Sequence, residues 1–207
     1  MRNTTIDQWY TDLASASPAP GGGAAAGMSA AMGAALVSMV CNLTIGKPKY
    51  AEHEEIAREV LAAAESARND AQRLAEDDET AFNGVIAAYK MPKDTDEEKA
   101  ARTDAVQKGL VQAAETPLAV CEVAARIIKL AGRIMNHSNP NVVSDVAVAA
   151  SAARSALESA ALNVDINLAS IKSADERERI ASEMNESLQT KVQAEAIIVA
   201  VTRRIKS

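Results

Sequence analysis

One carboxylate falls where a helical pattern demands an apolar side chain. Through the second quarter of the chain, apolar residues recur every three or four positions, but the step from Leu74 to Phe82 spans eight, and Asp78 lies between them. Burial and neighbouring charges shift the pKa of such an acid, so Asp78 is a candidate for acid–base chemistry or for stabilising a cation. The alternative is a structural ion pair with an Arg or Lys from another helix, such as Arg102 or Arg126.

A second polar stripe follows the turn cluster at residues 136–141. Asp145 and Asn163 are eighteen residues apart, which is five full helical turns, and Asn167 lies one turn further along the same face. The positions between them on that face are alanines: Ala149, Ala152, Ala156 and Ala160. Small side chains let a neighbouring helix or a flat ligand approach, and buried polar groups need partners. The stripe therefore either pairs internally or binds a ligand, and Asp145 by itself also fits an acid favoured by the helix macrodipole.

Three consecutive glycines, Gly21, Gly22 and Gly23, separate a proline-rich helix stop from a long apolar run. A glycine-rich loop that enters a helix presents backbone N–H groups to an anion or to the polar edge of a ring. The same glycines also permit a tight turn and close helix packing, and both interpretations stay open. Dinucleotide binding is rejected, because that fold needs a strand before the glycines and residues 14–20 do not form one.

The histidines and cysteines form no recognisable catalytic or metal-binding motif. His53 and His137 belong neither to a Glu-x-x-His pair nor to HExxH, so we expect no metal site. Cys41 and Cys121 lie in apolar surroundings without CxxC spacing, which is typical of reduced core thiols in a cytosolic protein.

Composition predicts that helices position all of these residues. Alanine, the best helix former, accounts for 44 of the 207 residues, whereas the aromatic side chains that strands favour make up 2%. The expected fold is all-α, with a single domain over residues 1–207 built as an antiparallel bundle of long helices. Periodicity and turn signals predict helices at 4–16, 24–44, 50–90, 96–135, 144–171 and 175–205. Pro117 either kinks the fourth helix or starts a new one, and Ser144 is the expected cap of the fifth.

The segment at residues 24–45 fits two environments. It carries no charge over 22 residues, which is long enough to span a bilayer, but Ala, Gly and Ser dominate it. A helix without a polar face also fits the centre of a bundle. We therefore expect a buried, small-residue central helix and no membrane partner.

Charge and the N-terminal residues exclude two further classes. The net charge is −6, and the chain has neither the basic tract nor the aromatic platform that nucleic-acid binding requires. The first residues lack the apolar stretch of a signal peptide. We expect no nucleic-acid partner and a cytoplasmic location.

Several short stretches, taken together, resemble one known family. They are Ser17–Ala24, Met32–Leu36, Asn42–Gly46, Asp77–Phe82, Met91–Glu98, Ser144–Ala149 and Ala161–Asn167. Their order and extent are similar to the formiminotransferase-cyclodeaminase C-terminal family, which includes stand-alone methenyltetrahydrofolate cyclohydrolases. The chain departs from the family pattern at Ser138, where a glycine is expected, and at Asp165 between the two asparagines.

The resemblance implies an all-α cytosolic homodimer that acts on a tetrahydrofolate substrate without a cofactor. It implies that Asp78 is catalytic, and we expect Asp145 to be a second catalytic carboxylate beside the folate. A carboxylate suits this substrate because it stabilises the cationic methenyl bridge and can orient or deprotonate water. The other residues expected around the folate are Gly21, Gly22, Gly23, Lys47, Ser144, Asn163 and Asn167. Lys47 or Lys49 suits the glutamate carboxylates, and the two asparagines suit the pterin edge.

Two activities follow from the resemblance, and one non-enzymatic interpretation stands beside them. The chain carries no formiminotransferase domain that could hand over a formimino group, so we expect a cyclohydrolase that converts 5,10-methenyltetrahydrofolate to 10-formyltetrahydrofolate. The alternative is a formiminotetrahydrofolate cyclodeaminase, which releases ammonia while the methenyl bridge closes. The non-enzymatic alternative is a helical scaffold whose polar stripes pair internally and bind no folate.

Overall fold

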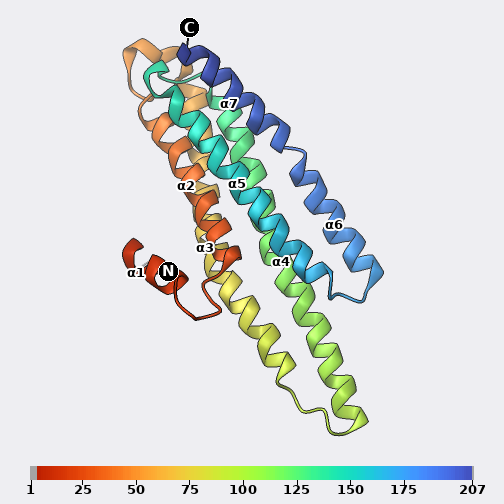
Figure 1. Cartoon of the computed structure of the whole chain (residues 1–207). Coiled ribbons are helices and arrows are strands. Elements are labelled where there is room, and N and C mark those ends of the chain that lie inside the picture. The colour runs from red at the N-terminus through yellow and green to blue at the C-terminus, as the bar shows by residue number, and fades with distance from the viewer. Residues whose placement is uncertain (1–3, 207) are drawn as a thin grey trace.

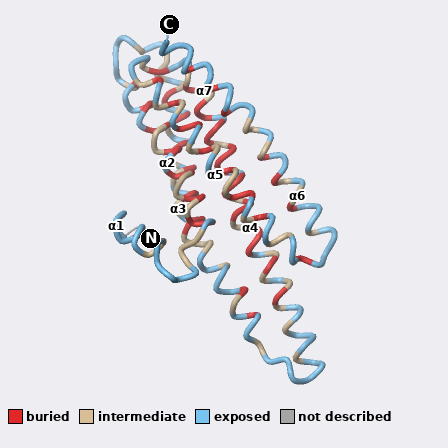
Figure 2. Tube along the Cα trace, in the orientation of Figure 1, coloured by how far each residue is buried: buried red, intermediate tan, exposed pale blue. Residues whose placement is uncertain are grey.

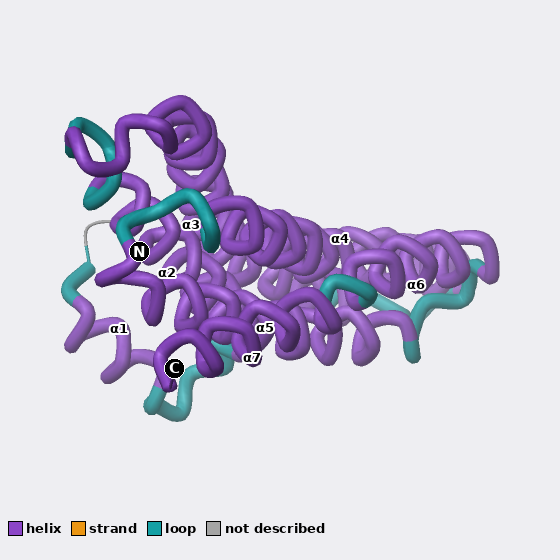
Figure 3. The backbone as a smooth tube through the Cα atoms, turned by 90° about the horizontal axis from the view of Figure 1, so that it is seen from above, coloured by secondary structure: helices purple, strands orange, loops and turns teal. Residues whose placement is uncertain are grey.

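The computed structural model describes residues 4–206, and within that range it contains helices and no strand (Figures 1 and 3). The elements in chain order are α1 (Ile6–Leu13), α2 (Gly22–Asn42), the 3-10 helix η1 (Pro48–His53), α3 (Glu54–Tyr89), α4 (Asp96–Ile134), the 3-10 helix η2 (Pro140–Val142), α5 (Val143–Leu168), α6 (Ala174–Leu188) and α7 (Lys191–Lys206). The predicted all-α fold is confirmed.

Four long helices, α2, α3, α4 and α5, form an antiparallel bundle (Figure 1). Each packs against its neighbours, and α2 and α5 also pack against each other, which closes the bundle. Helices α6 and α7 cover its outer side against α4 and α5. The C-terminal part of α3 and the N-terminal part of α4 extend beyond the other helices as a hairpin. Helix α1 lies beside the start of α2, and its Trp9 is buried.

Helix α2 is the buried small-residue helix that the composition predicts (Figure 2). Ala30 and Ala34 are fully buried, and two glycines let neighbouring backbones approach. A Cβ at Gly27 would lie 2.8 Å from the Cβ of Ala75, and one at Gly33 would lie 3.0 Å from the carbonyl oxygen of Ala149. By length and composition α2 could cross a membrane, but 61% of its apolar window is buried inside the protein.

The last predicted helix is wrong, because residues 175–205 form two helices that meet at Gln189 and Thr190. The Thr190 hydroxyl donates a hydrogen bond to the carbonyl oxygen of Ser187 at 2.7 Å. A hydroxyl that bonds back to a helix carbonyl competes with the regular backbone pattern. Neither Gly nor Pro marks this break, so the turn signals used for the other boundaries do not detect it.

Two predictions about helix boundaries concern Pro117 in α4 and Ser144 in α5. Helix α4 continues through Pro117, which is buried, so the proline does not start a new helix. Helix α5 begins at Val143 with Val142 as its N-cap, and Ser144 therefore lies inside the first turn instead of capping it. The turn before α5 is capped by Asn139, whose side-chain oxygen accepts from the backbone N–H of Asn141.

Candidate active site

A pocket of about 400 Å³ lies where the glycine loop enters α2, between α3, α4 and α5. The loop and the first turn of α2 form one wall, and the other three helices supply the rest. Its lining residues are Pro18, Ala19, Gly21, Gly22, Gly23, Asp78, Ala81, Phe82, Val85, Leu110, Ala113, Asn163, Ile166 and Asn167. Two parts of the chain that are far apart in sequence, the glycine loop and the end of α5, therefore face one space.

Asp78 projects from α3 against the first turn of α2. A Cβ at Gly23 would overlap the Asp78 carboxylate, so only glycine fits at that position. Burial raises the pKa of the Asp78 carboxyl, and the backbone N–H of Ala24, which hydrogen-bonds to it, opposes this shift. The N–H groups of a first helical turn favour an anion. Asp78 is thus a half-buried, partly desolvated carboxylate held by a helix N-terminus.

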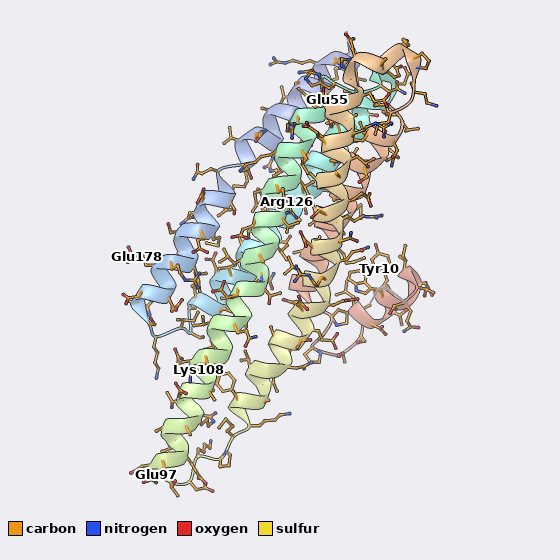
Figure 4. All side chains as sticks on the ribbon, turned by 180° about the vertical axis from the view of Figure 1, so that it is seen from behind. Tyr10, Glu55, Glu97, Lys108, Arg126 and Glu178 are labelled. Atoms are coloured by element: carbon orange, nitrogen blue, oxygen red, sulfur yellow. The ribbon has the colours of Figure 1, made fainter. Side chains whose placement is uncertain are left out.

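Neither guanidinium considered as a partner for Asp78 reaches it. Arg102 donates hydrogen bonds to the backbone oxygen of Tyr89 at 3.0 and 3.1 Å. Arg126, which lies on α4 beside α3 in Figure 4, pairs with Asp70 at 2.6 Å. Among residues 4–206 no ion pair to Asp78 is found, and Asp78 is the single titratable side chain that lines the pocket. The structural ion-pair interpretation is wrong.

The glycine loop serves close packing and the pocket at the same time. Gly21 is the N-cap of α2, and a Cβ at Gly22 would lie 3.4 Å from both amide atoms of Asn163. Gly22 and Gly23 therefore bring two polar side chains, one from α5 and one from α3, against a single helical turn. The close-packing interpretation is confirmed, and binding of a ligand by the loop stays a prediction.

Both asparagines of the α5 stripe face this pocket. Asn163 donates through Nδ2 to the carbonyl oxygen of Ser159 at 2.8 Å. Asn167 donates through Nδ2 to the carbonyl oxygens of Asn163 and Ala113, at 2.8 and 3.3 Å. These hydrogen bonds hold both side chains in place through Nδ2 and leave the Oδ1 atom of each asparagine to accept a hydrogen bond from a ligand.

The apolar part of the pocket contains residues that sequence reasoning assigned to the core or did not single out. Phe82 follows Asp78 by one helical turn, and its side chain is 37% exposed rather than fully buried. Ile166 lies between the two asparagines and is 72% exposed. The four-residue offset from Asp78 could have identified Phe82 as a neighbour of the site. Leu110 comes from α4, and no local signal connects it to the other two.

Lys47, Ser144 and Asp145 lie at the opposite end of the bundle within one chain. Eighteen residues of helix separate Asp145 from Asn163, which corresponds to about 27 Å along α5. Lys47 follows the other end of α2 and is exposed, as is Ser144. The structure therefore brings the glycines, Asp78 and the asparagines together and leaves these three residues outside their pocket.

The histidines and cysteines lie away from the pocket. The rings of His53 and His137 pack edge to face, with centroids 5.4 Å apart. Over the part of the chain that the structure describes, no three His, Cys, Asp or Glu residues are grouped to hold a metal ion. Cys41 and Cys121 are free and buried, and burial raises the pKa of each thiol to about 12.

Comparison with known proteins gives concordant matches. Residues 5–186 match a family model described as formiminotransferase-cyclodeaminase. A methenyltetrahydrofolate cyclohydrolase from Methylorubrum extorquens is 50% identical over 165 residues, which cover 80% of this chain and 79% of that protein. A formimidoyltransferase-cyclodeaminase from Rattus norvegicus is 32% identical over 205 residues, covering 99% of this chain but 38% of the rat protein.

A solved structure shares the architecture as well. The crystal structure of formiminotetrahydrofolate cyclodeaminase from Thermotoga maritima superposes with a TM-score of 0.84 at 28% sequence identity. The match covers 98% of this chain and 96% of that one. The bundle described above therefore corresponds to a known fold along nearly its whole length.

Proposed function

Because the chain belongs to the formiminotransferase-cyclodeaminase family, we propose that it is a methenyltetrahydrofolate cyclohydrolase, which hydrolyses 5,10-methenyltetrahydrofolate to 10-formyltetrahydrofolate. The observation that carries this proposal is Asp78, a partly desolvated carboxylate without a cationic partner in a pocket otherwise free of titratable side chains. The relative from Methylorubrum extorquens, which matches over most of both chains, supports the choice of activity.

The substrate supplies the cation that Asp78 lacks. In 5,10-methenyltetrahydrofolate the bridging carbon belongs to an amidinium shared by N5 and N10. A carboxylate in a pocket with largely apolar walls attracts that cation more strongly than it would in water. Binding places the electrophilic carbon beside Asp78, where the carboxylate also holds a water molecule by hydrogen bonding.

Asp78 then transfers the proton that the reaction requires. The water oxygen forms a bond to the bridging carbon and loses a proton to Asp78, which gives a neutral carbinolamine. Asp78 returns that proton to N5 as the carbon–N5 bond breaks, and the hydroxyl proton passes to solvent water as the formyl C=O forms. A raised pKa suits both halves of this exchange, because a general acid–base group works best with a pKa near the working pH.

A cyclodeaminase is the second candidate function. The relatives from Rattus norvegicus and Thermotoga maritima carry that name. In that reaction N10 attacks the formimino carbon of 5-formiminotetrahydrofolate, ammonia leaves and the methenyl bridge closes. The same carboxylate would stabilise the same developing cation, so the pocket does not separate the two activities.

Paired assays on the purified chain separate them. One follows the loss of methenyltetrahydrofolate absorbance above the spontaneous rate, and the other follows ammonia release from formiminotetrahydrofolate. Hydrolysis with little ammonia release is the expected result. Ammonia release as the faster reaction would make the chain a cyclodeaminase, and neither activity would return the helical scaffold as the better interpretation.

The proposed enzyme is a cytosolic homodimer whose copies meet through α2. Met32, Met39 and Leu43 are exposed on this helix, which carries no charged residue, so its outer face can meet a second copy without repulsion. A two-fold axis across the middle of α2 makes the paired helices antiparallel and the interface self-complementary. Light scattering at micromolar concentration should give twice the chain mass, and a monomer mass contradicts this arrangement.

The antiparallel pairing gives the remaining predicted residues a role. Helix α2 is 21 residues, or about 32 Å, long, and the pocket lies at its beginning. In such a dimer the far end of one copy approaches the pocket of the other. Lys47, Ser144 and Asp145 of the partner subunit then complete the folate site around Asp78. No metal, cofactor, nucleic acid or membrane takes part in this proposal.

A further inference from the structure

The polar lining of the pocket is unevenly distributed among the helices. Apart from Asp78, the walls from α3 and α4 are apolar, with Phe82, Val85 and Leu110 as their larger side chains. The polar side chains that remain, Asn163 and Asn167, both come from α5. Since Asp78 is committed to the reacting carbon in the proposed reaction, Asn163 and Asn167 on α5 are the polar side chains of this pocket lining that remain for the hydrogen-bonding edge of a bound heterocycle.

Asn167 can offer a ligand only an acceptor. Both of its Nδ2 hydrogens are used, one toward the carbonyl oxygen of Asn163 and one toward that of Ala113. A primary amide has two N–H donors, so none is left, while its Oδ1 has no donor among the hydrogen bonds of residues 4–206. These two donations also hold the side chain in place between α5 and α4.

Asn163 offers both kinds of group. Its Nδ2 makes one hydrogen bond, to the carbonyl oxygen of Ser159, which leaves one N–H donor and the Oδ1 acceptor. Its amide atoms lie over Gly22, where a Cβ would come within 3.4 Å of them, so glycine keeps this side open. Asn163 and Asn167 are four residues apart, about 6 Å along the helix axis, and lie on the same face.

Resting on the proposed function, we infer that these two asparagines recognise the amino-pyrimidinone edge of the pterin. Along that edge the ligand presents a carbonyl acceptor at C4, an N–H donor at N3 and an amino donor at C2. Asn163 donates to the C4 carbonyl and accepts from N3–H, and Asn167 Oδ1 accepts from the 2-amino group. The recognition edge thus lies on α5, and the pterin face rests on the apolar walls beside Phe82.

Binding of tetrahydrofolate and its 2-desamino analogue, measured by calorimetry, tests this inference without requiring turnover. In the wild type the analogue leaves Asn167 Oδ1 without a donor, and an unsatisfied buried acceptor costs about tenfold to a hundredfold in affinity. In Asn167→Leu the two ligands should bind within about twofold of each other, since neither finds an acceptor there. Asn185→Leu, on the exposed surface of α6, is the matched control and should keep the wild-type preference.

A smaller replacement covers the case in which Asn167→Leu does not fold. Asn167→Ala removes the Oδ1 acceptor without adding bulk, so the two ligands should again bind within about twofold of each other. Equal binding of both ligands to the wild type, or an unchanged preference in Asn167→Leu, overturns the inference while leaving the hydrolysis assay unaffected. If the wild type binds neither ligand and shows no hydrolysis, the proposed function itself fails.

Discussion

The two ends of the α2–α5 pair hold the two candidate carboxylates in opposite surroundings. Asp78 lies against Gly23 in a pocket without a cation, and burial raises its pKa. Asp145, which is half-buried like Asp78, lies in the first turn of α5 at the far end, next to the exposed Ser144 and outside that pocket. A carboxylate acquires an unusual proton affinity from desolvation more than from its place in a motif. Proton transfer within one chain therefore belongs to the Asp78 end, and the far end can contribute only through a second copy.

Filling the space beside Asp78 should remove most of the catalytic activity that distinguishes the Asp78 end from the Asp145 end. In Gly23→Ala the new Cβ overlaps the carboxylate, so Asp78 must move. A displacement of about 1 Å at a reacting group costs about 10²-fold in rate, and we expect kcat to fall by that factor. Steady-state hydrolysis of methenyltetrahydrofolate measures it. A kcat equal to that of the wild type would show that the position of Asp78 does not matter.

Neutralising the far end should have a smaller effect that depends on dimerisation. Asp145→Asn removes the negative charge that the partner subunit contributes to the proposed composite site, and we expect about a tenfold loss of kcat/KM. Mixed Asp145→Asn and Asp78→Asn subunits should regain activity, because about a quarter of the sites in exchanged two-fold dimers carry both native carboxylates. The absence of any recovery after verified subunit exchange contradicts a shared site.

Changing the pH should distinguish the two carboxylates next. Catalysis needs ionised Asp78, so kcat/KM should fall as the pH drops through a pKa that burial has raised above the ordinary aspartate value. Asp145→Asn should keep this profile. A fall in kcat/KM at the pH where an ordinary solvated aspartate titrates would contradict the effect of burial on the pKa of Asp78.

The raised pKa of Asp78 also has a consequence for stability. In the unfolded chain Asp78 releases its proton at lower pH than in the folded protein, so the wild type loses stability as the pH rises from the unfolded to the folded pKa. Asp78→Asn avoids this loss. Its melting temperature should exceed that of the wild type at neutral pH, and the difference should vanish below the unfolded pKa.

The smallest effect is expected at a glycine outside the pocket. Gly84 lies in α3, and a Cβ there would meet no atom within 4 Å. Gly84→Ala should stabilise the protein by about 0.5–1 kcal/mol, since alanine loses less backbone entropy in a helix, and should leave activity unchanged. Denaturant unfolding measures the first and the hydrolysis assay the second. This variant is the matched control for Gly23→Ala.

Local periodicity could predict the faces of helices but not which end of a face meets the site. The seam of α3 identified Asp78, and the absence of charge in α2 identified the central helix. Asp145 and Asn163 share a face of α5, yet about 27 Å separates them. The sequence pattern gives the angular position of each residue around α5 but not its distance from the pocket along the helix axis.

Contacts between distant segments account for most of the rest that the sequence did not predict. Leu110 lines the pocket because α4 packs beside α3 and α5. No sequence pattern within α4 predicts that contact. At the break between α6 and α7 the Thr190 hydroxyl donates a hydrogen bond back to the carbonyl oxygen of Ser187, and neither Gly nor Pro marks the break in the sequence. The family resemblance implied a role for Lys47 from its residue type, but it did not indicate where Lys47 lies relative to Asp78.

Asp78 carries the proton in the proposed folate hydrolysis, and a comparison of two variants tests this role most directly. Asp77→Asn is the matched control, because Asp77 lies outside the pocket and pairs with Arg73 at 3.5 Å. With methenyltetrahydrofolate as substrate, Asp78→Asn should lower kcat by about 10³-fold while the protein remains folded. Asp77→Asn should stay within about threefold of the wild type, as expected for a surface pair. Hydrolysis by folded Asp78→Asn within about threefold of the wild-type rate would contradict the account, since general acid–base catalysis by this residue contributes far more than that.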